Sequence, residues 1–157
     1  MCIEQFAEIS KTLLTPIIAV VATYIAYQQW KTNKQKLGLD LYDRRLKVYE
    51  EVRQILSIIL RDGKASYEDL SKFYRAVSEA DFLFKSEITD YINEIYERGV
   101  NLQCWSEQYR DNTQDRPDGY NHQKIVDGKH VELNWLIKQS EPAKQKFKKY
   151  LDISQLT

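Results

Sequence analysis

The chain has 157 residues with 23 Lys and Arg against 23 Asp and Glu, so its formal net charge at neutral pH is zero. This balance excludes the global basic field that draws many proteins to nucleic acid. Only five glycines, three prolines and two cysteines occur, which disfavours a disulfide framework and favours helices in a reducing compartment. We therefore expect an all-α protein with one helical domain.

The first expected element is an uncharged stretch at residues 12–30. Its 19 residues approach the roughly 20 that a helix needs to cross a bilayer. A cleaved signal peptide is the main alternative, but Glu4 and Glu8 precede the stretch and no small-residue cleavage site follows it. A buried core helix is the other alternative, and it is disfavoured because no charge interrupts the stretch. The sequence predicts an N-terminal tail and transmembrane helix at residues 1–34, with the lipid bilayer as a partner.

The flanking charges predict the direction of this helix. Lys11 is the one nearby base before it, whereas six bases follow it: Lys31, Lys34, Lys36, Arg44, Arg45 and Lys47. The positive-inside rule then places the following domain in the cytoplasm and the N-terminus outside, in a bacterial inner membrane. Tyr24, Tyr27 and Trp30 cluster at the end of the stretch, where aromatic side chains anchor helices at the headgroups.

Small and polar residues recur along one side of the same stretch at spacings of three and four. They are Thr12, Thr15, Ala19, Ala22, Thr23, Ala26, Gln29 and Asn33. In lipid, small residues and hydroxyls let helices approach closely and bond to each other. The pattern predicts a homo-oligomer, in which the stripe either lines a narrow pore or forms a packing contact.

Residues 35–157 are expected to form a cytosolic helical domain, a small antiparallel bundle. Its first helix, residues 40–60, carries apolar residues at helical spacing and could continue the preceding span as one rod. Gly63 is predicted to end it, and Ser66 with Asp69 to begin the next helix through a capping box. The run at residues 81–84, DFLF, is predicted to lie in the core.

Three more helical segments are expected toward the C-terminus. One begins at Ser86 or Thr89 and contains Gly99, which weakens its continuity. Residues 111–121 combine most turn formers and predict an exposed loop. The chain then resumes as a helix at His122 and again near Ser140.

Catalytic signatures are scarce. No phosphate-binding loop, nucleophile triad or metal-spaced cluster is present, so we expect no cofactor and no metal, and we do not expect an enzyme. One pair is notable, Arg116 and His122, because its R-x(5)-H spacing resembles the motif of HEPN-type helical ribonucleases. In such a pair the guanidinium stabilises a pentacovalent phosphate while the imidazole moves a proton. Pro117 and Gly119 follow the arginine here, unlike the polar residue usual in that family.

Residues 16–52 resemble the N-terminal part of a widespread group of small, uncharacterised bacterial single-pass membrane proteins. The similarity lies in the apolar stretch, the basic turn and the helix LDLYDRRLKVYE, with further likeness in ILRDGKASYEDL and EADFLF. The architecture also resembles the membrane-pore accessory proteins of RNA-targeting CRISPR systems. That resemblance implies helical domains that multimerise and gather their spans during phage infection.

These observations predict a homo-oligomeric single-pass membrane protein that serves as an antiphage-defence membrane effector or accessory. One alternative is a membrane-tethered ribonuclease using Arg116 and His122, with RNA as a partner. Another is a non-catalytic scaffold that recruits a cytosolic defence protein to the membrane, and a nucleotide messenger is a further partner that the resemblance leaves open.

Overall fold

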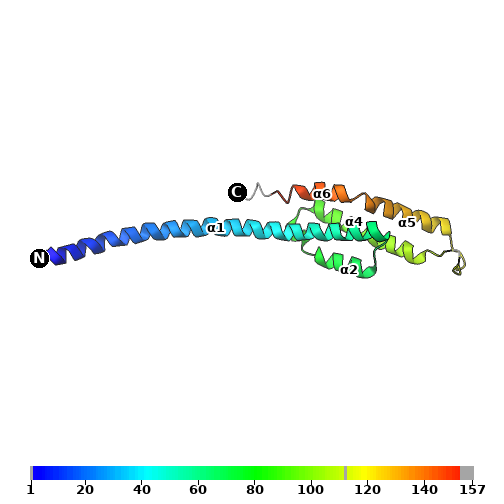
Figure 1. Cartoon of the computed structure of the whole chain (residues 1–157), viewed down its shortest axis with the longest axis horizontal. Coiled ribbons are helices and arrows are strands. Elements are labelled where there is room, and N and C mark those ends of the chain that lie inside the picture. The colour runs from blue at the N-terminus through cyan, green and yellow to red at the C-terminus, as the bar shows by residue number, and fades with distance from the viewer. Residues whose placement is uncertain (1, 112, 153–157) are drawn as a thin grey trace. The chain divides into compact units, whose positions relative to one another are not determined.

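The computed structural model describes residues 2–111 and 113–152, without the side chains of residues 2–13 and 15. Within those residues the secondary structure is helical and contains no strand, so the predicted all-α class is confirmed (Figure 1). The helices are α1 (Cys2–Asp62), α2 (Tyr67–Ala76), α3 (Ala80–Leu83), α4 (Ser86–Gln108), α5 (His122–Ile137) and α6 (Ser140–Lys148). The chain divides into two compact units, of which the first ends at Asp40 and the second begins at Leu41.

The first unit is the N-terminal part of α1. Helix α1 is assigned without interruption from Cys2 to Asp62, as the sequence suggested. It passes through Gly38 without a break and contains Pro16 in its interior. Every described side chain from Pro16 to Leu37 is exposed.

The predicted transmembrane helix needs a correction. In the part of the chain that the structure describes, no helix combines the length and the apolar content required to cross a membrane. The physical reason is the composition of residues 23–30, where Thr23, three aromatic side chains and two glutamines dilute the aliphatic residues. The prediction that residues 12–30 form such a helix is therefore not supported.

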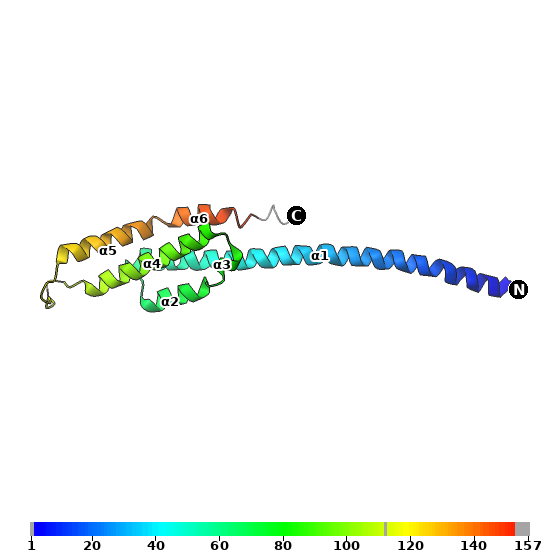
Figure 2. The same cartoon turned by 180° about the vertical axis from the view of Figure 1, so that it is seen from behind.

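The second unit is built around one hydrophobic core. Both views show α2, α4 and α6 beside the C-terminal part of α1, whereas α5 lies beside α4 (Figures 1 and 2). The face that α1 contributes to the core consists of Val48, Val52, Ile55, Leu56 and Ile59. Phe147 of α6 is fully buried and its ring lies 5.3 Å from the rings of Tyr49 and Phe84. This aromatic cluster joins α6, near the end of the chain, to α1.

Local signals fix the start of α2 and the contact between α2 and α4. The Ser66 side chain accepts a hydrogen bond from the Asp69 backbone, and the Asp69 carboxylate accepts one from the Ser66 backbone, as the capping box predicts. Gly99 lies buried inside α4, where a Cβ atom would come within 2.7 Å of Leu70 Cδ2. The glycine therefore lets α2 approach α4 closely.

The expectation that residues 81–84 form a core segment is only partly right. Phe84 is buried, but Phe82 is 89% exposed. The short helix α3 turns Phe82 outward, because Ala80 and Phe84, four residues apart, occupy its inner face.

Arg45 ties the ends of two helices to α1. Its Nε atom donates to the Leu83 carbonyl at 3.0 Å and its Nη1 atom donates to the Tyr150 carbonyl at 3.4 Å. The guanidinium also lies 5.8 Å from the centre of the Phe84 ring and 5.6 Å from that of Tyr150. One side chain thus satisfies the carbonyl of the last residue of α3 and a carbonyl just after α6.

The substitution Arg45→Ala is expected to lower the free energy of unfolding by about 2 kcal/mol, because charge-assisted hydrogen bonds to two carbonyls are lost. Urea unfolding of the full chain measures this change. The neighbouring Arg44→Ala serves as the control, since the ion pair of Arg44 with Glu79 is exposed and its loss should cost less than about 1 kcal/mol. Equal effects of the two substitutions would contradict the role given to Arg45.

Candidate functional site

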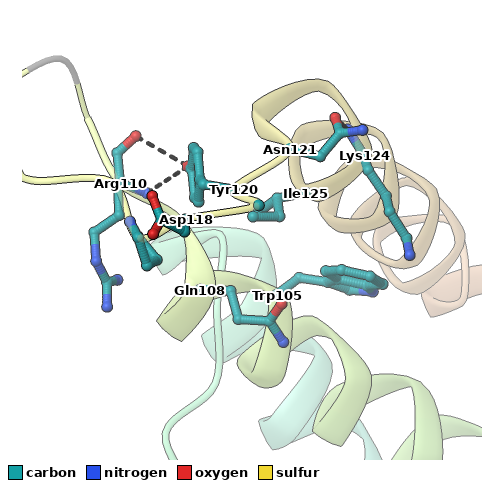
Figure 3. Close-up of a pocket in the computed structure, with 10 residues that line it drawn as sticks. Trp105, Gln108, Arg110, Asp118, Tyr120, Asn121, Lys124 and Ile125 are labelled. Atoms are coloured by element: carbon teal, nitrogen blue, oxygen red, sulfur yellow. Dashed lines mark hydrogen bonds between the residues drawn. The ribbon is translucent and has the colours of Figure 1, made fainter.

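A pocket lies where α4 ends and α5 begins. It has a volume of about 350 Å³ and is formed by the last turn of α4, the connecting loop and the first turn of α5 (Figure 3). Its lining residues are Trp105, Gln108, Arg110, Pro117, Asp118, Gly119, Tyr120, Asn121, Lys124 and Ile125. All of them lie in the second unit.

Tyr120 holds the loop against the end of α4. Its hydroxyl accepts a hydrogen bond from the Arg110 backbone N–H at 2.9 Å and also lies 3.2 Å from the Arg110 carbonyl (Figure 3). The same hydroxyl lies 3.2 Å from Nδ1 of His122. Gly119 makes this return possible, because its φ of +81° belongs to the left-handed region that other residues rarely adopt. The pocket wall is therefore fixed by hydrogen bonds across a ten-residue separation.

Trp105 forms the wall on the side of α4. A Cβ atom at Gly128 would lie 2.6 Å from Cε2 of the Trp105 indole, so the absence of a side chain at Gly128 lets the ring lie directly against α5. Ile125 is buried beside it and extends the apolar part of the pocket. The packing of α4 against α5 therefore holds Trp105 and Ile125, which form this wall of the pocket, in place.

The polar groups of the pocket differ in whether they have a hydrogen-bond or ion-pair partner. The Arg110 Nη1 atom donates to the carbonyls of Glu107 and Tyr109, so its guanidinium covers the end of α4. The Asn121 carbonyl oxygen accepts from the Lys124 backbone N–H at 3.0 Å and caps α5. Within the described residues the Lys124 ammonium and the Asp118 carboxylate make no hydrogen bond or ion pair.

The predicted pair Arg116 and His122 lies next to this pocket and is connected through Tyr120. The Arg116 guanidinium lies 5.4 Å from the centre of the Tyr120 ring, and His122 Nδ1 faces the Tyr120 hydroxyl. The His122 ring also lies 5.6 Å from the ring of Tyr109. The structure thus groups the two residues around one tyrosine, and neither of them lines the pocket. Among the described residues, no group of three or more side chains is arranged to hold a metal ion.

The second feature with functional potential is the uncovered surface of α1 in the first unit. We call residues 16–30 the apolar segment. Its large apolar side chains are exposed: Ile18 is 59% exposed and Val20 is 69% exposed. The other exposed large apolar side chains of the segment are Ile17, Val21, Tyr24, Ile25, Tyr27 and Trp30. A contiguous apolar surface of this length is unusual in a soluble monomer and is typical of surfaces that bind a partner or lipid.

The predicted small-residue stripe runs along this segment. Ala19, Ala22, Thr23, Ala26, Gln29 and Asn33 are all exposed, whereas the side chains of Thr12 and Thr15 lie outside the described part of the structure. Thr23 Oγ1 donates to the Ala19 carbonyl at 2.8 Å. A shallow apolar hollow beside the stripe is lined by Ala19, Val20, Thr23, Tyr24 and Tyr27.

The predicted interface anchors lie at the C-terminal end of the apolar segment. The rings of Tyr27 and Trp30 are 6.2 Å apart, and the Lys34 ammonium lies 5.8 Å from the Trp30 ring centre. Tyr24 accepts a hydrogen bond from the Gln28 side chain at 2.9 Å. Aromatic and basic side chains therefore gather where the apolar segment gives way to a polar one.

The comparisons with known proteins add no family to these observations. No protein-family model, curated protein or solved structure matches the chain.

Sequence reasoning did not identify the pocket. Residues 111–121 were interpreted as an exposed loop, and most of that loop is exposed. No sequence signal indicated the pocket, because the half-burial of Tyr120 depends on its hydrogen bonds to Arg110 at the end of α4.

The substitution Tyr120→Phe is expected to release the loop while leaving the ring in place. Loss of the hydroxyl leaves the Arg110 N–H without its partner, so hydrogen exchange at the Arg110 amide should accelerate by roughly fivefold, as for one hydrogen bond. Exchange measured by NMR on the full chain reports this residue individually. Tyr74→Phe is the control, since Tyr74 is 55% exposed and distant in sequence. Unchanged exchange at Arg110 in Tyr120→Phe would show that the tyrosine does not anchor the loop.

Proposed function

We propose that the protein is a membrane-attached homo-oligomer that uses the apolar segment to bind lipid and holds its helical domain on the cytoplasmic side. The observation that carries this proposal is the exposure of the large apolar side chains of residues 16–30. An exposed apolar surface of this extent is normally covered, either by protein or by lipid. Because these apolar side chains are exposed, lipid is a covering that can contact all of them at once.

The polar side chains of the segment support contact with lipid. Thr23 bonds to the Ala19 carbonyl and Gln28 bonds to the Tyr24 hydroxyl, so these polar groups find partners within the helix itself. In a hydrocarbon environment an unpartnered polar group costs several kcal/mol. Internal pairing of this kind lowers the cost of taking the segment out of water.

The distribution of charge supports the orientation. The arrangement of Tyr27, Trp30 and Lys34 suits the headgroup region, where aromatic rings anchor and lysines face phosphates. The bases that follow residue 30 outnumber the single Lys11 before residue 12. In this proposal the second unit therefore lies on the cytoplasmic side, because the anionic lipids of the cytoplasmic leaflet attract such a group of bases.

Self-association is supported by the stripe of small residues. Ala19 and Thr23 help to line a shallow apolar hollow along the helix. In lipid such small positions allow two helix backbones to approach closely, which favours packing of like segments. The proposed partner in the bilayer is thus a second copy of the chain.

Two finer functions stay predictions. The role in antiphage defence, by a pore or another perturbation of the membrane, rests on the resemblance in architecture and on the polar end of the stripe at Gln29 and Asn33. The ribonuclease alternative rests on Arg116 and His122. Its test is RNA cleavage by the full chain, which His122→Ala should abolish if the pair is catalytic.

Membrane attachment is tested by Val21→Lys. A lysine within the apolar segment brings a charge that must be desolvated when the segment enters lipid, at a cost of up to about 3 kcal/mol, so this variant should leave the membrane fraction while the unchanged chain remains in it. Gln35→Lys is the matched control, because it adds the same charge at an exposed position beyond the apolar segment. Recovery of the unchanged chain in the soluble fraction would contradict attachment.

The self-association part is measured with the same membranes. Two differently tagged copies should co-purify from detergent extracts. If the chain stays in the membrane fraction but the two tagged copies do not co-purify, the proposed self-association is wrong and the proposed membrane attachment stands.

A further inference from the structure

We infer that the pocket between α4 and α5 binds a small planar aromatic compound that carries an acidic group at one end and a hydrogen-bond donor at the other. This inference concerns the second unit alone and does not depend on attachment to a membrane. It rests on the shape of the pocket, on the apolar surfaces that line it and on the opposed charges at its two ends.

The size and lining suit a compact ring system. A volume of about 350 Å³ falls within the roughly 300–1,000 Å³ of small-molecule sites. The indole of Trp105, the ring of Tyr120 and the side chains of Pro117 and Ile125 supply the apolar surface. Aromatic walls of this kind favour flat rings, which gain offset stacking or edge-to-face contact in addition to burial.

The helix side of the pocket favours an acidic group. Lys124 extends from the first turn of α5 toward the side on which Trp105 lies (Figure 3). Its ammonium has no hydrogen-bond or ion-pair partner within the described residues. The first turn of α5 adds the partial positive charge of its backbone N–H groups, of which the Asn121 side chain caps the one at Lys124. A carboxylate or phosphate is the group that this combination recognises.

The loop side of the pocket favours a donor. Asp118 lies beside Tyr120 and Arg110, away from Lys124 (Figure 3). Its carboxylate makes no hydrogen bond or ion pair within the described residues, so it is available to accept from an amine or a ring N–H. The Gln108 amide lies between the two ends and can donate and accept. A ligand with an acidic group at one end and a hydrogen-bond donor at the other can pair with the Lys124 ammonium and the Asp118 carboxylate at the same time.

The walls are fixed before a ligand arrives, which strengthens the inference. Tyr120 is held by the Arg110 backbone, and Trp105 is held against Gly128. A site whose walls are already ordered loses little conformational entropy on binding. The pocket is thus distinct from an incidental gap between flexible side chains.

The test uses the full chain and two probes that have this chemistry, adenosine monophosphate and tryptophan. At least one probe should bind saturably by calorimetry and should shift the Trp105 indole N–H signal in NMR spectra, while the signals of Trp30 and Trp135 stay in place. Lys124→Gln should weaken that binding about tenfold, the effect of one charged hydrogen bond. Lys124→Arg keeps the charge and should retain binding.

Lys138→Gln is the matched control, because Lys138 is an exposed lysine at the other end of α5. It removes the same charge and should leave affinity unchanged. Absence of saturable binding by both probes, or equal weakening by Lys124→Gln and Lys138→Gln, would overturn the inference. If adenosine monophosphate is the probe that binds, adenosine and inorganic phosphate are tested separately. Each should bind at least tenfold more weakly than adenosine monophosphate. If either binds as tightly as adenosine monophosphate, the requirement for both a ring and an acidic group is overturned.

Discussion

The structure depends on one constraint, which is that the apolar side chains of α1 must be shielded from water. In the second unit the helix buries Val52 and Ile55 against α2, α4 and the C-terminal helices, and this burial is the main source of stability for the domain. In the first unit the same helix leaves Ile18 and Val20 largely exposed to solvent. The hydrophobic effect acts equally on both parts. The proposed attachment to lipid follows from this difference and not from any catalytic motif.

The second unit closes its core with a few specific contacts. The Phe147 ring meets Tyr49 and Phe84, and Arg45 bonds to the carbonyls of Leu83 and Tyr150. These contacts secure one part of the domain, where α1, α3 and α6 meet. The pocket is built separately, from the end of α4 and the start of α5, and it depends on Tyr120 instead. The domain thus has an aromatic cluster that closes its core and a pocket that is held in place by separate contacts.

Local sequence patterns predicted much of the fold. The capping box of Ser66 and Asp69, the continuity of α1 and the start of α5 at His122 depend on neighbouring residues, and the structure has all three. The outward position of Phe82 was not predictable, because helix α3 is only four residues long and its inner face depends on the packing around it. The partners of Arg45 lie 38 and 105 residues away in sequence. No local pattern indicates such contacts.

The candidate site was predicted less well than the fold. The spacing of Arg116 and His122 resembled a catalytic motif, yet the residues that line the pocket include their neighbours Asp118, Tyr120 and Lys124. A spacing motif indicates which residues are close in sequence, whereas a pocket depends on how the loop returns to its helices. The return requires the left-handed conformation at Gly119 and the hydrogen bonds of Tyr120.

The most direct test of the central claim is quenching of Trp30 fluorescence by brominated lipids. Trp105→Phe and Trp135→Phe together leave Trp30 as the one tryptophan of the chain. In vesicles, its emission should be blue-shifted and should be quenched most strongly by lipids brominated near the headgroups, because an anchoring ring lies at that depth. Emission typical of a fully hydrated indole, unaffected by brominated lipids at any depth, would contradict the account.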